Sequence, residues 1–137
     1  MFSYLRDHKN YLVRLPLILY WIILFILTSL PTGLAIETRD VSDKVLHFGA
    51  YGLLSVLLYL NLYFQNKSNL LSFYAGLFTI LIASFYGVLD EIHQMYVPGR
   101  SAEFLDWFAD FTGSLTAVLI TKYLLTYFIK LEAQKSK

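Results

Sequence analysis

Apolar and polar positions follow one another in long blocks along the 137-residue chain. The apolar blocks cover about residues 12–30, 45–64, 70–95 and 104–129. Each is close to the roughly 20 residues that a transmembrane helix needs. Between them lie short polar segments with helix-stopping signals, namely Pro31, Gly33 and the VPGRS sequence of 97–101. The pattern predicts an all-α fold, a four-helix transmembrane bundle in which 1–137 form one domain.

Composition agrees with the bilayer as the solvent of this chain. Hydrophobic residues make up 57% and charged residues only 15%, whereas soluble domains carry about 25% charge. The basic start and the apolar run of 15–30 also resemble a signal peptide, but we expect a retained first span. Cysteine is absent, which excludes disulfides and thiolate chemistry. The sequence has no basic run outside the two tails, so it gives no indication of a nucleic-acid partner.

The distribution of lysine and arginine predicts the orientation of the bundle. Positive charges gather before the first span, in the turn near 65–69 and after the fourth span, and four spans place these segments on one side. By the positive-inside rule that side is the cytoplasm, so both termini are predicted to be cytoplasmic. The loop at 31–44 and the turn at 97–101 are then predicted to face outward.

The polar residues near the outward ends recur every four residues, which places them on single helix faces. The sets are Asp43, His47 and Tyr51; Tyr86, Asp90 and Gln94, with Glu91 beside them; and Asp106 and Asp110, continued by Gly113 and Ser114. A carboxylate inside the bilayer costs about 2.5–3.5 kcal/mol, so such side chains face a bundle interior or a water-filled pocket. We therefore expect the acids at 90, 91, 106 and 110 to converge, with Lys44, His47 and Arg100 nearby.

Several interpretations of this polar cluster stay open at the sequence level. Either Lys44 and Arg100 neutralise the acids, or a divalent cation such as Mg²⁺, Mn²⁺ or Ca²⁺ does, or some acids hold protons. His47 is a candidate acid, base or metal ligand, or it pairs with Asp90 or Asp106 to join helices. Arg100 suits a phosphate and equally suits Asp106. His93 lies off the stripe and is expected at the rim.

Two sequence blocks resemble a known family. DKVLHFGAYGLL (43–54) and YGVLDEIHQMYVPGRSAEFLDWFADFTG (86–113) are similar to the VanZ-like membrane proteins, a family named for a protein linked to resistance to the glycopeptide teicoplanin. The resemblance implies a bacterial inner-membrane protein that acts near the outer face on envelope lipids or lipid-linked precursors. Asp110 stands where the family usually has asparagine. This extra carboxylate needs a cation or a partner such as Lys44 or Arg100.

The favoured hypothesis is a membrane enzyme or binder for an amphiphile with a phosphate or sugar headgroup. The residues expected to carry chemistry are His47, Asp90, Glu91, Asp106 and Asp110. Those expected to hold the headgroup are Lys44, Tyr51, Tyr86, Gln94 and Arg100. The competing hypothesis is a non-catalytic accessory or structural subunit of a membrane complex, in which the same cluster sets helix order. Ion translocation is disfavoured, because the inner halves of the helices are nearly free of ionisable groups.

Overall fold

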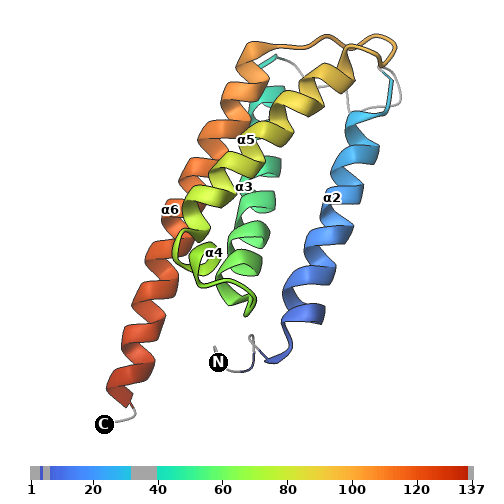
Figure 1. Ribbon diagram of the computed structural model, residues 1–137. Coiled ribbons are helices and arrows are strands. Elements are labelled where there is room, and N and C mark those ends of the chain that lie inside the picture. The colour runs from blue at the N-terminus through green and yellow to red at the C-terminus, as the bar shows by residue number, and fades with distance from the viewer. Residues whose placement is uncertain (1–3, 5–6, 32–39, 136–137) are drawn as a thin grey trace.

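The computed structural model describes residue 4, residues 7–31 and residues 40–135. Its described part is mainly helical, with short turns between the helices, and contains no strand (Figure 1). The elements are η1 (Asn10–Arg14, π-helical), α2 (Leu15–Thr28), α3 (Asp40–Phe64), α4 (Asn69–Phe73), α5 (Ala75–Gln94) and α6 (Phe104–Lys135). Within that part, four helical segments are long and apolar enough to cross a membrane, which confirms the all-α, four-span prediction.

The helix bounds differ from the expected ones at three places. Helix α3 begins at Asp40, so Asp43 and Lys44 lie in its first turns and not in the preceding loop; most of that loop, 32–39, is outside the described residues. The third apolar block is interrupted at Tyr74, between α4 and α5. Helix α6 continues to Lys135, past the expected end at 129.

Burial in the bundle is inverted relative to a soluble protein. Large apolar side chains such as Ile22, Phe25 and Phe85 are about half exposed or more, at 51%, 53% and 66%. Polar side chains, by contrast, are buried between the helices, including Ser55, Thr79, Asp90, Asp110 and Ser114. Soluble proteins place these classes the other way round. An apolar surface around a polar interior is stable where the surrounding medium is lipid, so the chain is a multi-pass membrane protein.

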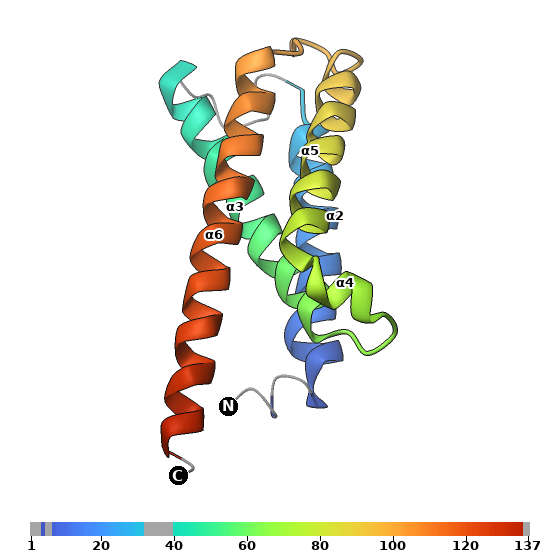
Figure 2. The ribbon, with the colours of Figure 1, turned by 60° about the vertical axis from the view of Figure 1, so that its left-hand side comes forward.

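Helices α3 and α6 cross at very close range (Figure 2). A Cβ added at Gly113 of α6 would lie 2.9 Å from the Cα of Phe48 in α3 and nearer still to its carbonyl oxygen. Glycine is therefore needed where the two backbones touch. Gly52 also faces this contact, since its Cβ would lie 3.6 Å from the Gly113 carbonyl oxygen. By spacing Gly49 is an equally good candidate for close packing, but a Cβ there would meet nothing within 4 Å.

Helix α2 packs on the face of α3 and α5. The Tyr20 hydroxyl donates to the carbonyl oxygen of Ala50 at 3.0 Å, and Trp21 meets Tyr86 edge-on with ring centroids 5.2 Å apart. The end of α2 thereby joins the start of α3, the end of α5 and the start of α6 at one end of the bundle (Figure 1). Helix η1 starts and α6 stops at the opposite end, as four spans require. Which side of the membrane each end faces stays a prediction.

Candidate functional site

The three polar stripes meet at the end of the bundle formed by the first turns of α3 and α6 and the last turns of α5. Their side chains are buried there, with relative exposures of 2% for Tyr51, 3% for Asp90, 7% for Glu91, 5% for Asp106 and 0% for Asp110. The expected convergence of the acids is thus observed. It follows from helical periodicity, because each stripe presents one face and the shared face is the bundle interior.

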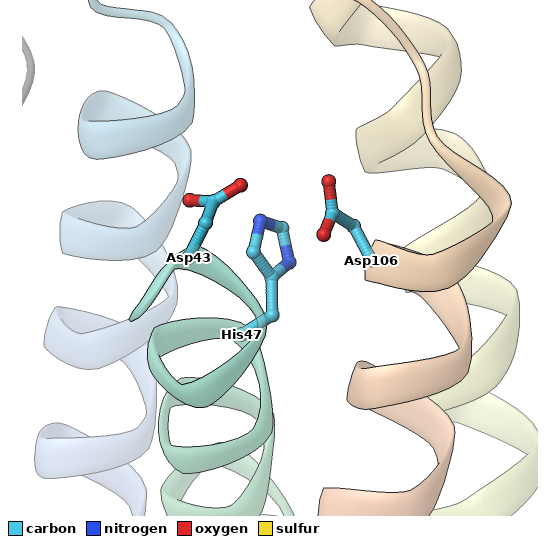
Figure 3. Close-up of side chains that lie close together, drawn as sticks. All are labelled: Asp43, His47 and Asp106. Carbon is cyan, nitrogen blue, oxygen red and sulfur yellow. The ribbon is translucent and has the colours of Figure 1, made fainter. Parts of the chain in front are cut away.

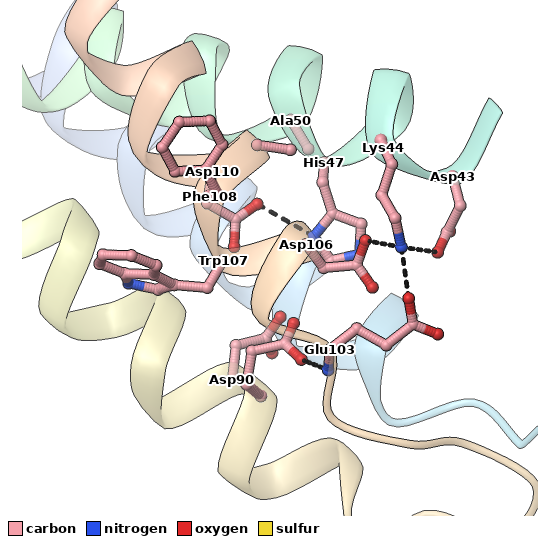
Figure 4. A network of polar contacts seen from close by, with 12 residues as sticks. Asp43, Lys44, His47, Ala50, Asp90, Glu103, Asp106, Trp107, Phe108 and Asp110 are labelled. Atoms are coloured by element: carbon pink, nitrogen blue, oxygen red, sulfur yellow. Dashed lines mark hydrogen bonds and ion pairs between the residues drawn. The ribbon is translucent and has the colours of Figure 1, made fainter. Parts of the chain in front are cut away.

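His47 and Asp110 form the central contact of the cluster (Figure 4). The Nδ1 of His47 lies 2.9 Å from Oδ1 of Asp110, joining α3 to α6. Of the alternatives left open by the sequence, the pairing of His47 with Asp90 or Asp106 and the pairing of Asp110 with Lys44 or Arg100 are not observed among the described contacts. In the tautomer with a proton on Nδ1, the neutral imidazole donates to Asp110 and keeps a lone pair on Nε2.

Lys44 is surrounded by carboxylates. Its ammonium contacts Asp106, lies 2.6 Å from Oε2 of Glu103 and reaches Asp43 at 4.0 Å (Figure 4). Lys44 therefore neutralises part of the cluster, one of the alternatives left open by the sequence. Sequence reasoning missed Glu103, which precedes α6 and lies outside the four-residue stripes. The available signal was its i, i+3 spacing to Asp106.

The end of α5 is connected to the turn that follows it. Glu91 accepts, through Oε2, the backbone N–H of Glu103 at 2.7 Å. Gln94 donates to Oδ2 of Asp90 at 3.2 Å and accepts from Arg100 at 3.0 Å. Arg100 also donates from Nε to the carbonyl oxygen of Leu30 at 3.1 Å, tying the end of α2 to the turn. Among the described contacts Arg100 makes no ion pair with Asp106, so that alternative is not observed.

Two residues at the edge of the cluster have supporting roles. His93 lies at the rim, as expected, with Nε2 3.0 Å from the Ser29 hydroxyl and its ring 5.1 Å from that of Phe25. The indole N–H of Trp107 donates to the Ser84 carbonyl oxygen at 3.1 Å. Trp107 therefore links α6 to α5.

An amphipathic cavity of about 290 Å³ lies between α2, α3 and α5 at this end. Its apolar wall is formed mainly by leucines, and its polar wall is formed by Asp43, His47, Asp90 and Arg100, with Tyr51 beside them. Lys44 is not part of the lining. Because the polar wall includes His47, the cavity brings the imidazole within reach of whatever binds there.

Two groups of described residues have donor atoms close enough together to hold a metal ion. One consists of Asp43, His47 and Asp106 (Figure 3), and the other of His47, Glu91 and Asp110. In each group one ligand atom per residue lies within 4.8 Å of the others. Both groups contain His47, so the imidazole is the point where the two halves of the cluster meet.

Comparison with known protein families gives one match. The model of the family described as VanZ/LLP1 matches residues 6–127, which is most of the chain and includes every residue of the polar cluster. Searches of curated proteins and of solved structures find no match. The matched segment contains both blocks that the sequence analysis related to VanZ-like proteins, and the four-span bundle fits them. The chain belongs to the VanZ/LLP1 family.

Proposed function

We propose that this protein binds a lipid or lipid-linked cell-envelope precursor in the cavity between α2, α3 and α5, and acts on its headgroup. The observation that carries the proposal is the two-sided lining of the cavity. Leu24, Leu27 and Leu46 offer an apolar surface to a hydrocarbon chain, while His47, Asp90 and Arg100 face the other end. A ligand that satisfies both walls is an amphiphile.

The charges at the polar wall favour a headgroup that combines a phosphate with hydroxyl groups. Arg100 provides the cation for a phosphate, whereas the carboxylates of Asp43 and Asp90 accept hydrogen bonds from sugar hydroxyls. Lys44, which we expected to share the headgroup, is held by Asp106 and Glu103 outside the cavity. Arg100 is therefore the headgroup cation in the proposal.

His47 is the group best placed for proton transfer. The fully buried carboxylate of Asp110 orients the ring through Nδ1, which leaves Nε2 as the nitrogen available for proton transfer. A buried acid behind a histidine is the arrangement that prepares an imidazole to take a proton from water or a hydroxyl group. An enzyme needs this base, whereas a lipid carrier does not.

Binding is tested by filling the cavity. Leu27→Trp places a large ring in the lining, while Leu19→Trp makes the same change on α2 at a similarly exposed residue that does not line the cavity. Purified variants in detergent are titrated with a polyprenyl phosphate and followed by native mass spectrometry. The proposal requires loss of binding in Leu27→Trp and retention in Leu19→Trp. Equal binding by both variants and the unaltered protein would refute it.

The competing function, an accessory or structural subunit, is favoured by the internal pairing of the cluster, in which Lys44, His47 and Arg100 all bond to other side chains. The variant Asp90→Asn distinguishes this structural function from the chemical one. A chemical role predicts normal expression with lost lipid turnover, whereas a structural role predicts a lower yield of folded protein.

A link to glycopeptide resistance comes only from the family name and is tested by measuring teicoplanin susceptibility with and without the protein.

The proposal places the polar end at the outer face of a bacterial cytoplasmic membrane. The chain has no cysteine, so single cysteines report orientation without interference. Ser101→Cys lies at the polar end and Gln134→Cys at the opposite end, both at exposed positions. In intact cells a membrane-impermeant maleimide should label the first and not the second. The reverse labelling pattern would show that the site faces the cytoplasm and would contradict the proposed orientation.

A further inference from the structure

Two buried carboxylates in the cluster each have one oxygen in use and one without a partner. Glu91 uses Oε2 to accept the Glu103 N–H, and Asp110 uses Oδ1 to face His47. Their other oxygens, Glu91 Oε1 and Asp110 Oδ2, are buried and have no hydrogen-bond partner in the described part of the chain. A buried carboxylate oxygen without a partner is costly, so it indicates a missing cation or donor.

A third donor completes this group. One atom each from His47, Glu91 and Asp110 lie within 4.8 Å of one another. Ligands bound at about 2.0–2.2 Å to one ion lie roughly 3–4 Å apart, so small side-chain movements would bring all three onto a common ion. If Nδ1 is the ligand atom, coordination replaces its hydrogen bond to Asp110, and the base role proposed above belongs to the metal-free protein.

A further polar group without a partner lies near Asp110. Gly87 of α5 packs closely on Asp110 and Tyr51, since a Cβ there would lie 3.1 Å from Oδ2 of Asp110 and 3.5 Å from Cε1 of Tyr51. The Tyr51 hydroxyl belongs to a side chain only 2% exposed and has no hydrogen-bond partner in the described structure. It is a second polar group in this region that awaits a ligand or a bound water.

The neighbouring group of Asp43, His47 and Asp106 is a weaker candidate. The ammonium of Lys44 contacts Asp106 and lies 4.0 Å from Asp43, so a cation already serves these carboxylates (Figure 4). No described lysine or arginine forms an ion pair with Glu91 or Asp110. Glu91 Oε1 and Asp110 Oδ2 are therefore the carboxylate oxygens that lack both a hydrogen-bond partner and a lysine or arginine among the described residues.

We infer that His47, Glu91 and Asp110 bind a divalent transition-metal ion. Mn²⁺ and Zn²⁺ are the ions that best match this set of ligands. One imidazole nitrogen with two carboxylate oxygens suits these ions, whereas Mg²⁺ and Ca²⁺ prefer oxygen ligands alone. Three protein ligands leave coordination positions for water or for a headgroup oxygen. The inference stands on the donor geometry and does not require that a lipid bind in the cavity.

The test is a Mn²⁺ titration of the purified full chain in detergent after chelator treatment. The signal of free Mn²⁺ is followed by electron paramagnetic resonance. We expect one Mn²⁺ per chain, displaced by Zn²⁺ and only at much higher concentration by Mg²⁺. Asp110→Asn and Glu91→Gln should each weaken binding roughly tenfold or more. Glu103→Gln is the matched control. It also removes one carboxylate charge, but the Glu103 side chain pairs with Lys44 and belongs to neither metal group, so this variant should bind Mn²⁺ like the unaltered protein.

Absence of Mn²⁺ binding at millimolar concentration would overturn the inference, as would equal weakening in Glu103→Gln. If Asp110→Asn does not fold, Glu91→Gln decides, because its amide oxygen can still accept the Glu103 N–H. The cavity-filling Leu27→Trp should bind Mn²⁺ normally. A failure of lipid binding and a failure of metal binding are therefore seen separately.

Discussion

Replacing Gly113 by alanine should disturb both the stability of the bundle and the geometry of the candidate site. The added Cβ would lie 2.9 Å from the Cα and carbonyl carbon of Phe48. Carbon atoms in ordinary contact are about 3.5–4.0 Å apart, so α3 and α6 must separate by about 1 Å. The atoms in conflict are backbone atoms of a helix, so no side-chain rotation relieves the contact. Overpacking of this kind costs about 1–3 kcal/mol.

The same movement acts on the central contact of the site. His47 precedes Phe48, and Asp110 lies one turn before Gly113, so both partners are carried by the two backbones that must separate. A displacement of about 1 Å lengthens the 2.9 Å contact between His47 and Asp110 beyond the roughly 3.6 Å at which a hydrogen bond is lost. Gly113→Ala is therefore predicted to uncouple the histidine from its carboxylate without altering either residue.

Two measurements check this prediction. Thermal unfolding in detergent, followed by helical circular dichroism, should show a midpoint lowered by several degrees. Nitrogen-15 labelling of the three histidines should show the Nδ1 resonance of His47 losing its hydrogen-bonded position. The matched control is Gly49→Ala on α3, where a Cβ meets nothing within 4 Å and alanine should be neutral or stabilising by about 0.5–1 kcal/mol. The reasoning fails if Gly113→Ala unfolds like the unaltered protein with its His47 signal unchanged, or if Gly49→Ala is destabilised as much.

Two further predictions concern the links between helices. Lys44→Met leaves the 5% exposed carboxylate of Asp106 without its cation and should cost about 3 kcal/mol in unfolding free energy; the double variant with Asp106→Asn should recover most of the loss, and no recovery would mean that the pair is not coupled. Tyr20→Phe removes the donor to the Ala50 carbonyl and should cost about 1 kcal/mol. Chemical denaturation in mixed micelles measures both, and a Tyr20→Phe variant of unchanged stability would show that this contact does not hold α2.

Much of the fold could be predicted from the sequence because it depends on local pattern. Apolar blocks of about 20 residues can be accommodated by a bilayer only as helices, and the four-residue spacing of Asp90 and Gln94, or of Asp106 and Asp110, places each pair on one face. The high cost of charge in lipid then directs those faces inward. These arguments need no knowledge of neighbouring helices, and the buried acids of α5 and α6 agree with them.

The pairing between helices was decided only by the tertiary structure. Sequence spacing orders residues along one helix but does not give the rotation, crossing and depth of that helix against the next. In this bundle the contact of Gly113 with Phe48 sets how closely α3 and α6 approach, and that approach brings His47 to Asp110. It also places Lys44 among Asp106 and Glu103 and leaves Arg100 to Gln94 and the end of α2. The sequence alone determined that acids and bases meet at one end of a membrane bundle, whereas their partners depend on backbone contacts between segments more than 50 residues apart.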